Sequence, residues 1–124
     1  YSMTFNVTQK KGEDRLTLNA ILNQRSQDVL AANNWNVVQY AVLVYMLAQV
    51  CDMNVGELVH VIADAHIYDR HVPIVEKIIK NEPKKAPKLI LDESVKDFYA
   101  FTKNSFSLPG YEYTELNEKI PIAV

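Results

Sequence analysis

Polar and apolar residues alternate in two stretches near the start of the chain. From Tyr1 to Thr8 every odd-numbered residue is apolar, and a similar alternation runs from Arg15 to Gln24. A period of two predicts β-strands with one buried face. The polar residues 9–14 between the stretches include a glycine, which suits a tight turn, so we expect the two strands to form a hairpin.

A long helix is predicted from Trp35 to Asp52. Apolar residues recur on nearly every side of its 3.6-residue period, so it should lie inside the fold with little solvent-exposed face. Asn33 or Asn34 is the expected N-cap. The preceding residues 25–34 are polar at both ends and are expected to form a loop.

The next segment predicts a strand and a second helix. Asn54-Val55-Gly56 is expected to be a turn, and the nearly continuous apolar run Glu57–Ala65 predicts a central strand. A second helix is predicted from Asp69 to Asn81. Pro73 falls in its first turn, where the missing N–H costs nothing.

Short strands at 88–91 and 105–108 complete the predicted elements. Together they predict one α+β domain over residues 1–124. It would contain a mixed sheet, a long buried helix and a second helix packed outside.

The composition argues against several classes of protein. Hydrophobic residues make up 48% and charged residues 23% of the chain, and the formal net charge is −2. Lys and Arg are not concentrated beyond Lys84-Lys85, so no nucleic-acid polymer is expected as a partner. The longest apolar run, Val37–Cys51, is shorter than the roughly twenty residues that span a bilayer, so no membrane association is expected.

The single cysteine, Cys51, excludes a disulfide within the chain and suits a reducing, cytoplasmic location. The N-terminus also lacks the basic flank and apolar segment of a secretory signal. No His or Arg stands beside Cys51 to stabilise a thiolate, which favours a structural role. The spacings of His60, His66 and His71 do not match zinc sites, so no metal is expected.

Arg25, Ser26 and Asp28 bring a guanidinium, a hydroxyl and a carboxylate together after the second strand. A guanidinium is a planar fork that suits phosphate, and a neighbouring hydroxyl can donate to the same oxygens. Asp28 could accept from the ring N–H groups of a heterocycle. A polar loop with a surface Arg–Asp pair explains the same residues, and composition alone favours this simpler interpretation.

Two further positions could recognise a nucleoside. Asn36 offers a donor and an acceptor side by side, which matches a carbonyl and ring N–H of uracil, although a helix cap is favoured for Asn36 alone. Asp64, His66 and Tyr68 alternate onto one side at the end of a predicted strand, a common place for ligands. His66 and Tyr68 together could hold a sugar hydroxyl.

The order and spacing of these residues, taken together, resemble the thymidylate synthase family over the whole chain. The motifs that carry the resemblance are Gln24-Arg25-Ser26-x-Asp28, Asn36-x-x-x-Tyr40-Ala41-x-Leu43, Met46-x-Ala48-Gln49-x-Cys51-Asp52-x-x-x-Gly56, Asp64-Ala65-His66-Ile67-Tyr68, Pro87-Lys88-Leu89, Gly110-Tyr111 and Ile122-Ala123-Val124. The resemblance implies the conversion of deoxyuridylate (dUMP) to thymidylate (dTMP). The one-carbon donor and reductant would be 5,10-methylenetetrahydrofolate, which leaves as dihydrofolate.

The resemblance also implies roles for individual residues. Asn36 would pair with the uracil carbonyl and N–H and serve catalysis. The other dUMP-binding residues would be Arg25 and Ser26 at the phosphate, His66 and Tyr68 at the deoxyribose 3′-hydroxyl, and Asp28 near the base. The implied folate-binding residues are Asp28 at the pterin ring, Ala32, Ala123 and Val124, with Val124 as part of a lid.

Some features depart from the family's pattern. Ala32-Asn33-Asn34-Trp35 stands where Gly-x-Pro-Phe is commoner, and Gln27 replaces a small residue, which indicates a subfamily variant. The family's nucleophile lies in a Pro-Cys-His segment immediately before the strand that Tyr1 begins, and this sequence does not contain it. We therefore expect the C-terminal part of a homodimeric enzyme, inactive by itself.

Two alternatives stay open. A deoxycytidylate hydroxymethylase shares the architecture but favours Asp at the Asn36 position, because cytosine presents an amino group where uracil has a carbonyl. A stand-alone module that binds nucleotides or other proteins without catalysis requires that these 124 residues be the natural product.

Overall fold

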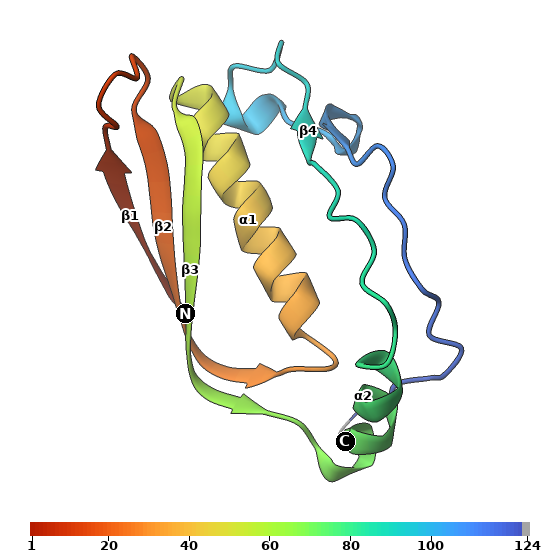
Figure 1. Ribbon diagram of the computed structural model, residues 1–124. Coiled ribbons are helices and arrows are strands. Elements are labelled where there is room, and N and C mark those ends of the chain that lie inside the picture. The colour runs from red at the N-terminus through yellow and green to blue at the C-terminus, as the bar shows by residue number, and fades with distance from the viewer. Residues whose placement is uncertain (123–124) are drawn as a thin grey trace.

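The computed structural model describes residues 1–122, and its first half is a three-stranded sheet with one long helix (Figure 1). The elements are β1 (Ser2–Thr8), β2 (Thr17–Asp28), α1 (Asn33–Val50) and β3 (Asn54–His66). β1 and β2 form the predicted antiparallel hairpin, whereas β2 and β3 run parallel and are connected through α1. The strand order is β1-β2-β3, so β2 is central.

The hydrophobic core lies between the sheet and α1. Leu18 and Ala20 of β2 pack with Val44 and Ala48 of α1, and all four side chains are buried. α1 is less enclosed than its apolar composition predicts, because the sheet covers only one of its sides. Near its start, Trp35 is 78% exposed.

β3 is an edge strand among residues 1–122, whereas the apolar run predicted a central one. Its side chains alternate between half-buried and exposed, and Val59 and Val61 are 47% and 48% exposed. The prediction was wrong because β3 pairs only with β2, so its other edge is unpaired within residues 1–122. The apolar run reflects apolar residues on both faces of β3, of which α1 covers one.

A β-bulge interrupts the pairing of β2 with β3 and makes Gly56 necessary. The register shifts between Leu18 and Ala20, and Asn19 turns its side-chain oxygen to the backbone N–H of Glu57 at 3.1 Å. A Cβ on Gly56 would lie 2.6 Å from the carbonyl oxygen of Leu18. The turn predicted at residues 54–56 is therefore wrong: these residues belong to β3 and form part of the bulge.

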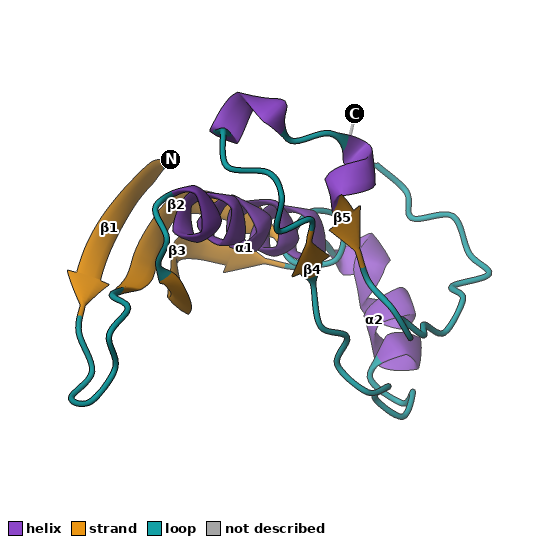
Figure 2. Cartoon of the chain, turned by 90° about the horizontal axis from the view of Figure 1, so that it is seen from above, coloured by secondary structure: helices purple, strands orange, loops and turns teal. Residues whose placement is uncertain are grey.

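The second half of the chain is less regular (Figure 2). The predicted helix from Asp69 to Asn81 is a 3₁₀ turn, Asp69–His71, followed by α2 (Val72–Ile78), with Pro73 near its start as predicted. β4 (Ile90–Leu91) and β5 (Phe106–Ser107) form an antiparallel pair within the two predicted short strands. The mixed α+β architecture is thus confirmed.

None of the helices in the described part of the chain has the length and apolar character needed to cross a membrane.

Candidate functional site

The candidate residues gather where β2 and β3 end. Both strands bend and pass beneath the N-terminus of α1, near α2 and the C-terminal segment (Figure 1). Ser26 lies opposite Asp64 in the parallel ladder, and Asp28 lies opposite His66. Residues 25–28 are therefore the end of β2, and the prediction of a loop there was wrong, because their backbone groups pair with β3.

Asp28 fixes the connection between β2 and α1. Its Oδ1 accepts hydrogen bonds from the backbone N–H groups of Leu30 at 3.1 Å and Ala31 at 3.0 Å. Its other oxygen accepts no hydrogen bond from the described residues. The carboxylate also lies close to the N-terminus of α1, where the helix dipole favours negative charge.

Ala32 is the N-cap of α1, so the predicted capping by Asn33 or Asn34 was wrong. No side chain in residues 1–122 caps the first turn of this helix. The Asp28 carboxylate instead accepts from backbone N–H groups just before the helix and stabilises the tight turn there. A cap from Asn33 or Asn34 is therefore not needed to fix the path of the chain.

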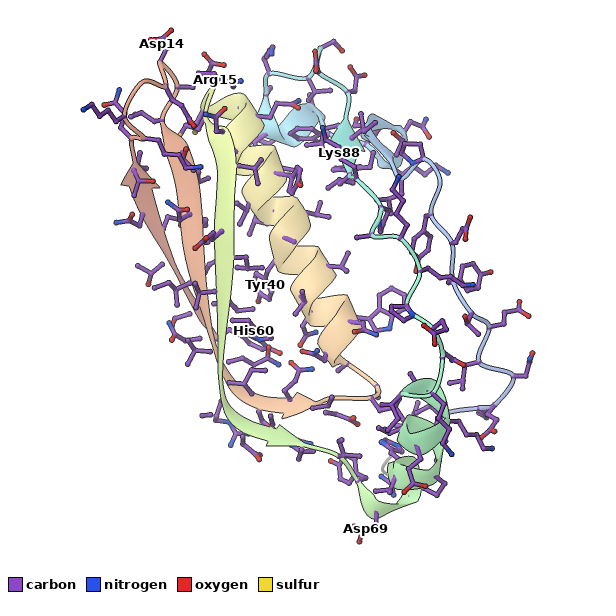
Figure 3. The ribbon with its side chains drawn as sticks, in the orientation of Figure 1. Asp14, Arg15, Tyr40, His60, Asp69 and Lys88 are labelled. Atoms are coloured by element: carbon purple, nitrogen blue, oxygen red, sulfur yellow. The ribbon has the colours of Figure 1, made fainter. Side chains whose placement is uncertain are left out.

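The Asn36 amide is held by a buried polar network behind it. Gln24 Nε2 donates to Asn36 Oδ1 at 3.0 Å, while Gln24 Oε1 lies 2.9 Å from His60 Nε2. Gln24 is 4% exposed, and Figure 3 places His60 on the side of β3 that faces α1. Asn36 Oδ1 also accepts from the Tyr1 hydroxyl at 3.3 Å. Because both of these donors point at Oδ1, the Asn36 amide is oriented before any ligand arrives.

Sequence reasoning missed Gln24, Gln27 and His60 as members of this network. Gln27 is 1% exposed and accepts a hydrogen bond from Gln24. The signal for Gln24 was present, because it continues the inward alternation of Leu18, Ala20 and Leu22 by one polar residue. A polar residue at an inward position is buried and needs partners.

The second cluster lies at the end of β3. His66 Nδ1 lies 3.5 Å from Asp64 Oδ2, and Ser26 Oγ donates to the same oxygen at 3.4 Å. The His66 ring meets the Tyr68 ring edge-on, with 5.2 Å between centroids. The structure thus brings together the three residues that alternation predicted on one side.

Arg25 is exposed and points to the opposite face of β2 from its neighbours Gln24 and Ser26. β1 pairs with β2 only as far as Asn23, so the edge of β2 beyond it is unpaired within residues 1–122. A long arginine side chain can reach round this open edge, but Arg25 and Ser26 do not meet in the structure.

Cys51 lies at the other end of α1 from Asn36, where it is exposed. Fifteen residues separate the two, which corresponds to roughly 22 Å along a helix. No group of metal-binding side chains occurs in the described part of the chain. The predicted folate contacts Ala123 and Val124 lie outside the described residues.

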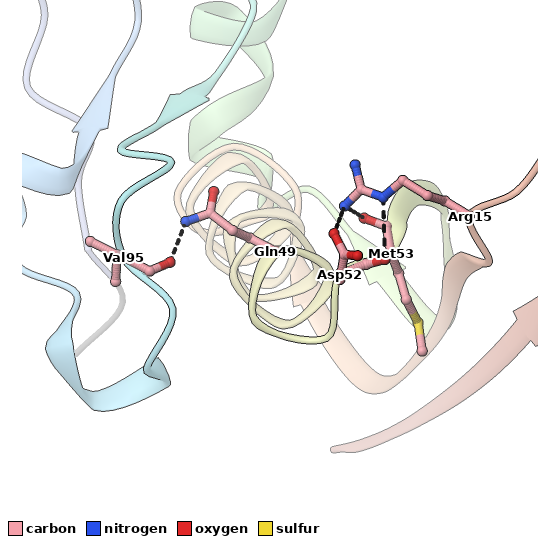
Figure 4. Close-up of polar contacts among 5 residues, drawn as sticks. All are labelled: Arg15, Gln49, Asp52, Met53 and Val95. Atoms are coloured by element: carbon pink, nitrogen blue, oxygen red, sulfur yellow. Dashed lines mark hydrogen bonds and ion pairs between the residues drawn. The ribbon is translucent and has the colours of Figure 1, made fainter.

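A sizeable hollow in the described structure lies away from this site. It encloses about 620 Å³ at the C-terminal end of α1, near Arg15 and Lys88, which Figure 3 places far from Asp69. Arg15 is already paired with Asp52 at 2.7 Å there (Figure 4). The hollow is open and its charges are mixed, so the convergent polar residues at the strand ends are the better candidates.

Comparison with known proteins agrees with this geometry. The family model described as thymidylate synthase matches residues 1–124. The chain belongs to the thymidylate synthase family. A curated relative, the bifunctional dihydrofolate reductase-thymidylate synthase of Zea mays, is 42% identical over 95 residues, which are 77% of this chain and 18% of that protein.

A solved thymidylate synthase has the same fold. Thermostable thymidylate synthase A from Bacillus subtilis superposes with a TM-score of 0.80 at 35% identity. The match covers 98% of this chain and 41% of that structure. The chain therefore spans less than half the length of either thymidylate synthase.

Proposed function

We propose that this chain is the C-terminal part of a thymidylate synthase that converts dUMP to dTMP. The reaction would consume 5,10-methylenetetrahydrofolate and release dihydrofolate. Family membership supports the reaction class, and one observation carries the assignment to this site. The Asn36 amide stands oriented at the start of α1, with its Oδ1 accepting from Gln24 Nε2 and from the Tyr1 hydroxyl.

Base recognition follows from the orientation of that amide. Uracil presents a carbonyl acceptor beside a ring N–H donor, and Asn36 offers Nδ2–H beside Oδ1. Oδ1 also accepts a long hydrogen bond from the Tyr1 hydroxyl at 3.3 Å, which the ring N–H would replace on binding, and Nδ2 donates to the carbonyl. Cytosine presents the reverse pattern, an amino donor beside a ring-nitrogen acceptor, so this orientation favours dUMP over the dCMP of the hydroxymethylase alternative.

The strand ends supply the remaining nucleotide contacts in this proposal. His66 and Tyr68 hold the 3′-hydroxyl, and their edge-on packing fixes both rings. Ser26 and Arg25 hold the phosphate, with Arg25 reaching round the open edge of β2. Arg70 lies 4.8 Å from the centroid of the Tyr68 ring and steadies it by a cation–π contact.

Asp28 serves the folate cosubstrate. Its Oδ1 is engaged by two backbone N–H groups, so the other oxygen is presented in a fixed direction to a pterin N–H. Ala32, Ala123 and Val124 would contact the same ligand. Ala32 lies half-buried at the end of the turn that Asp28 stabilises.

The chemistry also needs a thiolate that adds to carbon 6 of uracil, so that carbon 5 can attack the folate methylene. Elimination and hydride transfer from the folate then give dTMP and dihydrofolate. Cys51 cannot act here, because it lies at the far end of α1. The nucleophile would come from a preceding segment, in a cytoplasmic homodimer with neither a nucleic-acid polymer nor a membrane as partner.

The test compares the 124-residue chain with a completed enzyme. In the completed enzyme, the upstream part of the B. subtilis protein is fused before Tyr1. We expect dTMP from dUMP and methylenetetrahydrofolate with the fusion only, and weak dUMP binding by the chain alone. A folded fusion that makes no dTMP would refute the proposal, whereas turnover of dCMP instead would favour the hydroxymethylase.

The stand-alone alternative is tested separately. A native protein with an intact mass near 14.2 kDa would favour it.

A further inference from the structure

His71 is a buried side chain to which the proposed reaction assigns no role. It is 1% exposed and ends the 3₁₀ turn that precedes α2. Its backbone N–H donates to the carbonyl of Tyr68 at 2.7 Å, and its ring meets the Tyr68 ring edge-on, with 5.5 Å between centroids. The position of the imidazole is therefore fixed both by its backbone and by its packing.

One ring nitrogen of His71 holds the C-terminal segment. Nε2 lies 2.7 Å from the carbonyl oxygen of Pro121, fifty residues further along the chain. A carbonyl oxygen can only accept, so Nε2 carries the proton and donates it. This bond fixes the chain two residues before Ala123.

The other ring nitrogen faces the candidate folate site. Nδ1 is buried and has no hydrogen-bond partner in the described structure. The nearest acidic atom is Asp28 Oδ1, 3.7 Å away. A buried polar atom without a partner is uncommon. With the proton on Nε2, Nδ1 of a neutral ring is an acceptor like the carboxylate, so the two atoms can bond only when Nδ1 takes up a second proton and the imidazolium donates from both nitrogens. A shift of less than 1 Å would then bring them within hydrogen-bond distance.

We propose that His71 is a positioning residue that couples the C-terminal segment to Asp28. One rigid ring touches both, so a movement of the segment is passed directly to the carboxylate. When the cosubstrate binds, Nδ1 would take up a proton from solvent and close the 3.7 Å gap, so that the imidazolium donates to both Pro121 and Asp28. This inference rests on the proposed function, because it takes Asp28 as the group that meets the folate.

Two substitutions separate the two nitrogens of the ring. In His71→Gln the amide nitrogen can occupy the place of Nε2 and keep the bond to Pro121, but nothing faces Asp28. In His71→Asn the amide nitrogen can occupy the place of Nδ1, but it does not reach Pro121. Both variants and the wild type are made in the completed enzyme, with circular dichroism to verify folding.

Two readouts follow: the rate at which a carboxypeptidase digests the C-terminus, with and without a folate analogue, and the KM for methylenetetrahydrofolate. We expect His71→Asn to speed digestion of the ligand-free enzyme about tenfold. His71→Gln should digest like the wild type without ligand but lose most of the protection that the analogue gives. The folate KM should rise about tenfold in both, with the KM for dUMP within threefold of wild type.

Glu118→Gln is the matched control. Glu118 pairs with Lys77 of α2 and also ties the C-terminal segment down, but both side chains are partly exposed to solvent. Exposed pairs contribute little, so digestion and KM should change less than threefold.

Digestion rates and folate KM values that match the wild type in both His71 variants would overturn the inference while leaving the proposed function intact. A wild-type fusion without activity would refute the proposed function, but the digestion of the ligand-free protein would still test the bond to Pro121. If the variants do not fold, ¹⁵N-histidine spectra of the wild-type chain decide instead. They should show a proton on His71 Nε2 that exchanges slowly with solvent, and a rapidly exchanging proton or one on Nδ1 alone would contradict the inference.

Discussion

Gln24 Nε2 donates to Asn36 Oδ1 at 3.0 Å, so a buried amide of the central strand orients the first turn of α1. Gln24 is itself oriented by His60, whose Nε2 lies 2.9 Å from Oε1. The two hydrogen bonds connect β3 to β2 and β2 to the helix. The Tyr1 hydroxyl also donates to Asn36 Oδ1 at 3.3 Å, so Gln24, His60 and Tyr1 together set the orientation of Asn36.

Gln24→Glu should weaken the discrimination between uracil and cytosine. A carboxylate has no proton to donate, so Asn36 would turn its Nδ2 toward residue 24 and present the pattern that suits cytosine. In the completed enzyme we expect kcat/KM for dUMP to fall roughly tenfold to a hundredfold, with tighter inhibition by dCMP.

Gln39→Glu makes the same chemical change on the exposed side of α1 and serves as its control. It should leave both measurements within twofold of wild type. Unchanged discrimination in Gln24→Glu would mean that the network does not orient Asn36.

Gly56→Ala should destabilise the fold. The new methyl would lie 2.6 Å from the Leu18 carbonyl and would also strike the Asn19 side chain, which bonds the Glu57 N–H. Overpacking of this kind costs about 1–3 kcal/mol, measurable as a shift in the urea midpoint.

Gly12→Ala provides the comparison. Its φ is +88° but its Cβ would meet nothing within 4 Å, so only backbone strain of about 1–2 kcal/mol is expected. Both substitutions should lower the urea midpoint. Because the bulge requires a glycine at position 56, Gly56→Ala should unfold at a lower urea concentration than Gly12→Ala.

Asp52 is the one non-glycine residue with positive φ in the described part of the chain, at 53°. Arg15 holds it by a bond to its carboxylate at 2.7 Å and another to its carbonyl at 3.2 Å (Figure 4). Asp52→Asn should cost less than about 1 kcal/mol, because the pair is exposed and Asn tolerates this conformation.

Asp52→Ala should cost about 1–2 kcal/mol more than Asp52→Asn, because alanine is strained at positive φ. Equal urea midpoints for the two variants would show that backbone conformation contributes nothing at this position.

Asp92 should titrate below its usual value. Hydrogen bonds from the side chain and the backbone N–H of Ser94 hold the pKa of this carboxyl below 3.8. A lowered pKa stabilises the folded chain above pH 3.8, and this contribution is lost as the pH falls through the folded-state pKa.

Carboxyl NMR titration should therefore give Asp92 a midpoint under 3.8 that rises in Ser94→Ala. A midpoint that stays unchanged in this variant would contradict the assigned cause.

Local periodicity predicted the elements whose partners are close in sequence. The hairpin and α1 follow from alternation and helical period, because each pattern maps directly onto one geometry. The strand character of residues 25–28 was not predictable in this way, since it depends on pairing with Asp64, Ala65 and His66 far along the chain. Long-range contacts, not local preference, decide such segments.

The residues of the candidate site were likewise predictable only where their neighbours are close in sequence. Asp64, His66 and Tyr68 were predicted on one side because they belong to one strand end. The contact of His71 with Pro121 joins residues fifty positions apart and leaves no local signal.

The hairpin turn at residues 9–14 and the candidate site lie at opposite ends of β2, separated by roughly 35 Å of strand. Lys10 and Lys11 in this turn are exposed. A dye or a surface tether attached there would follow the protein without crowding its ligands. The turn is therefore a suitable attachment point for immobilised or single-molecule measurements of closure at the candidate site.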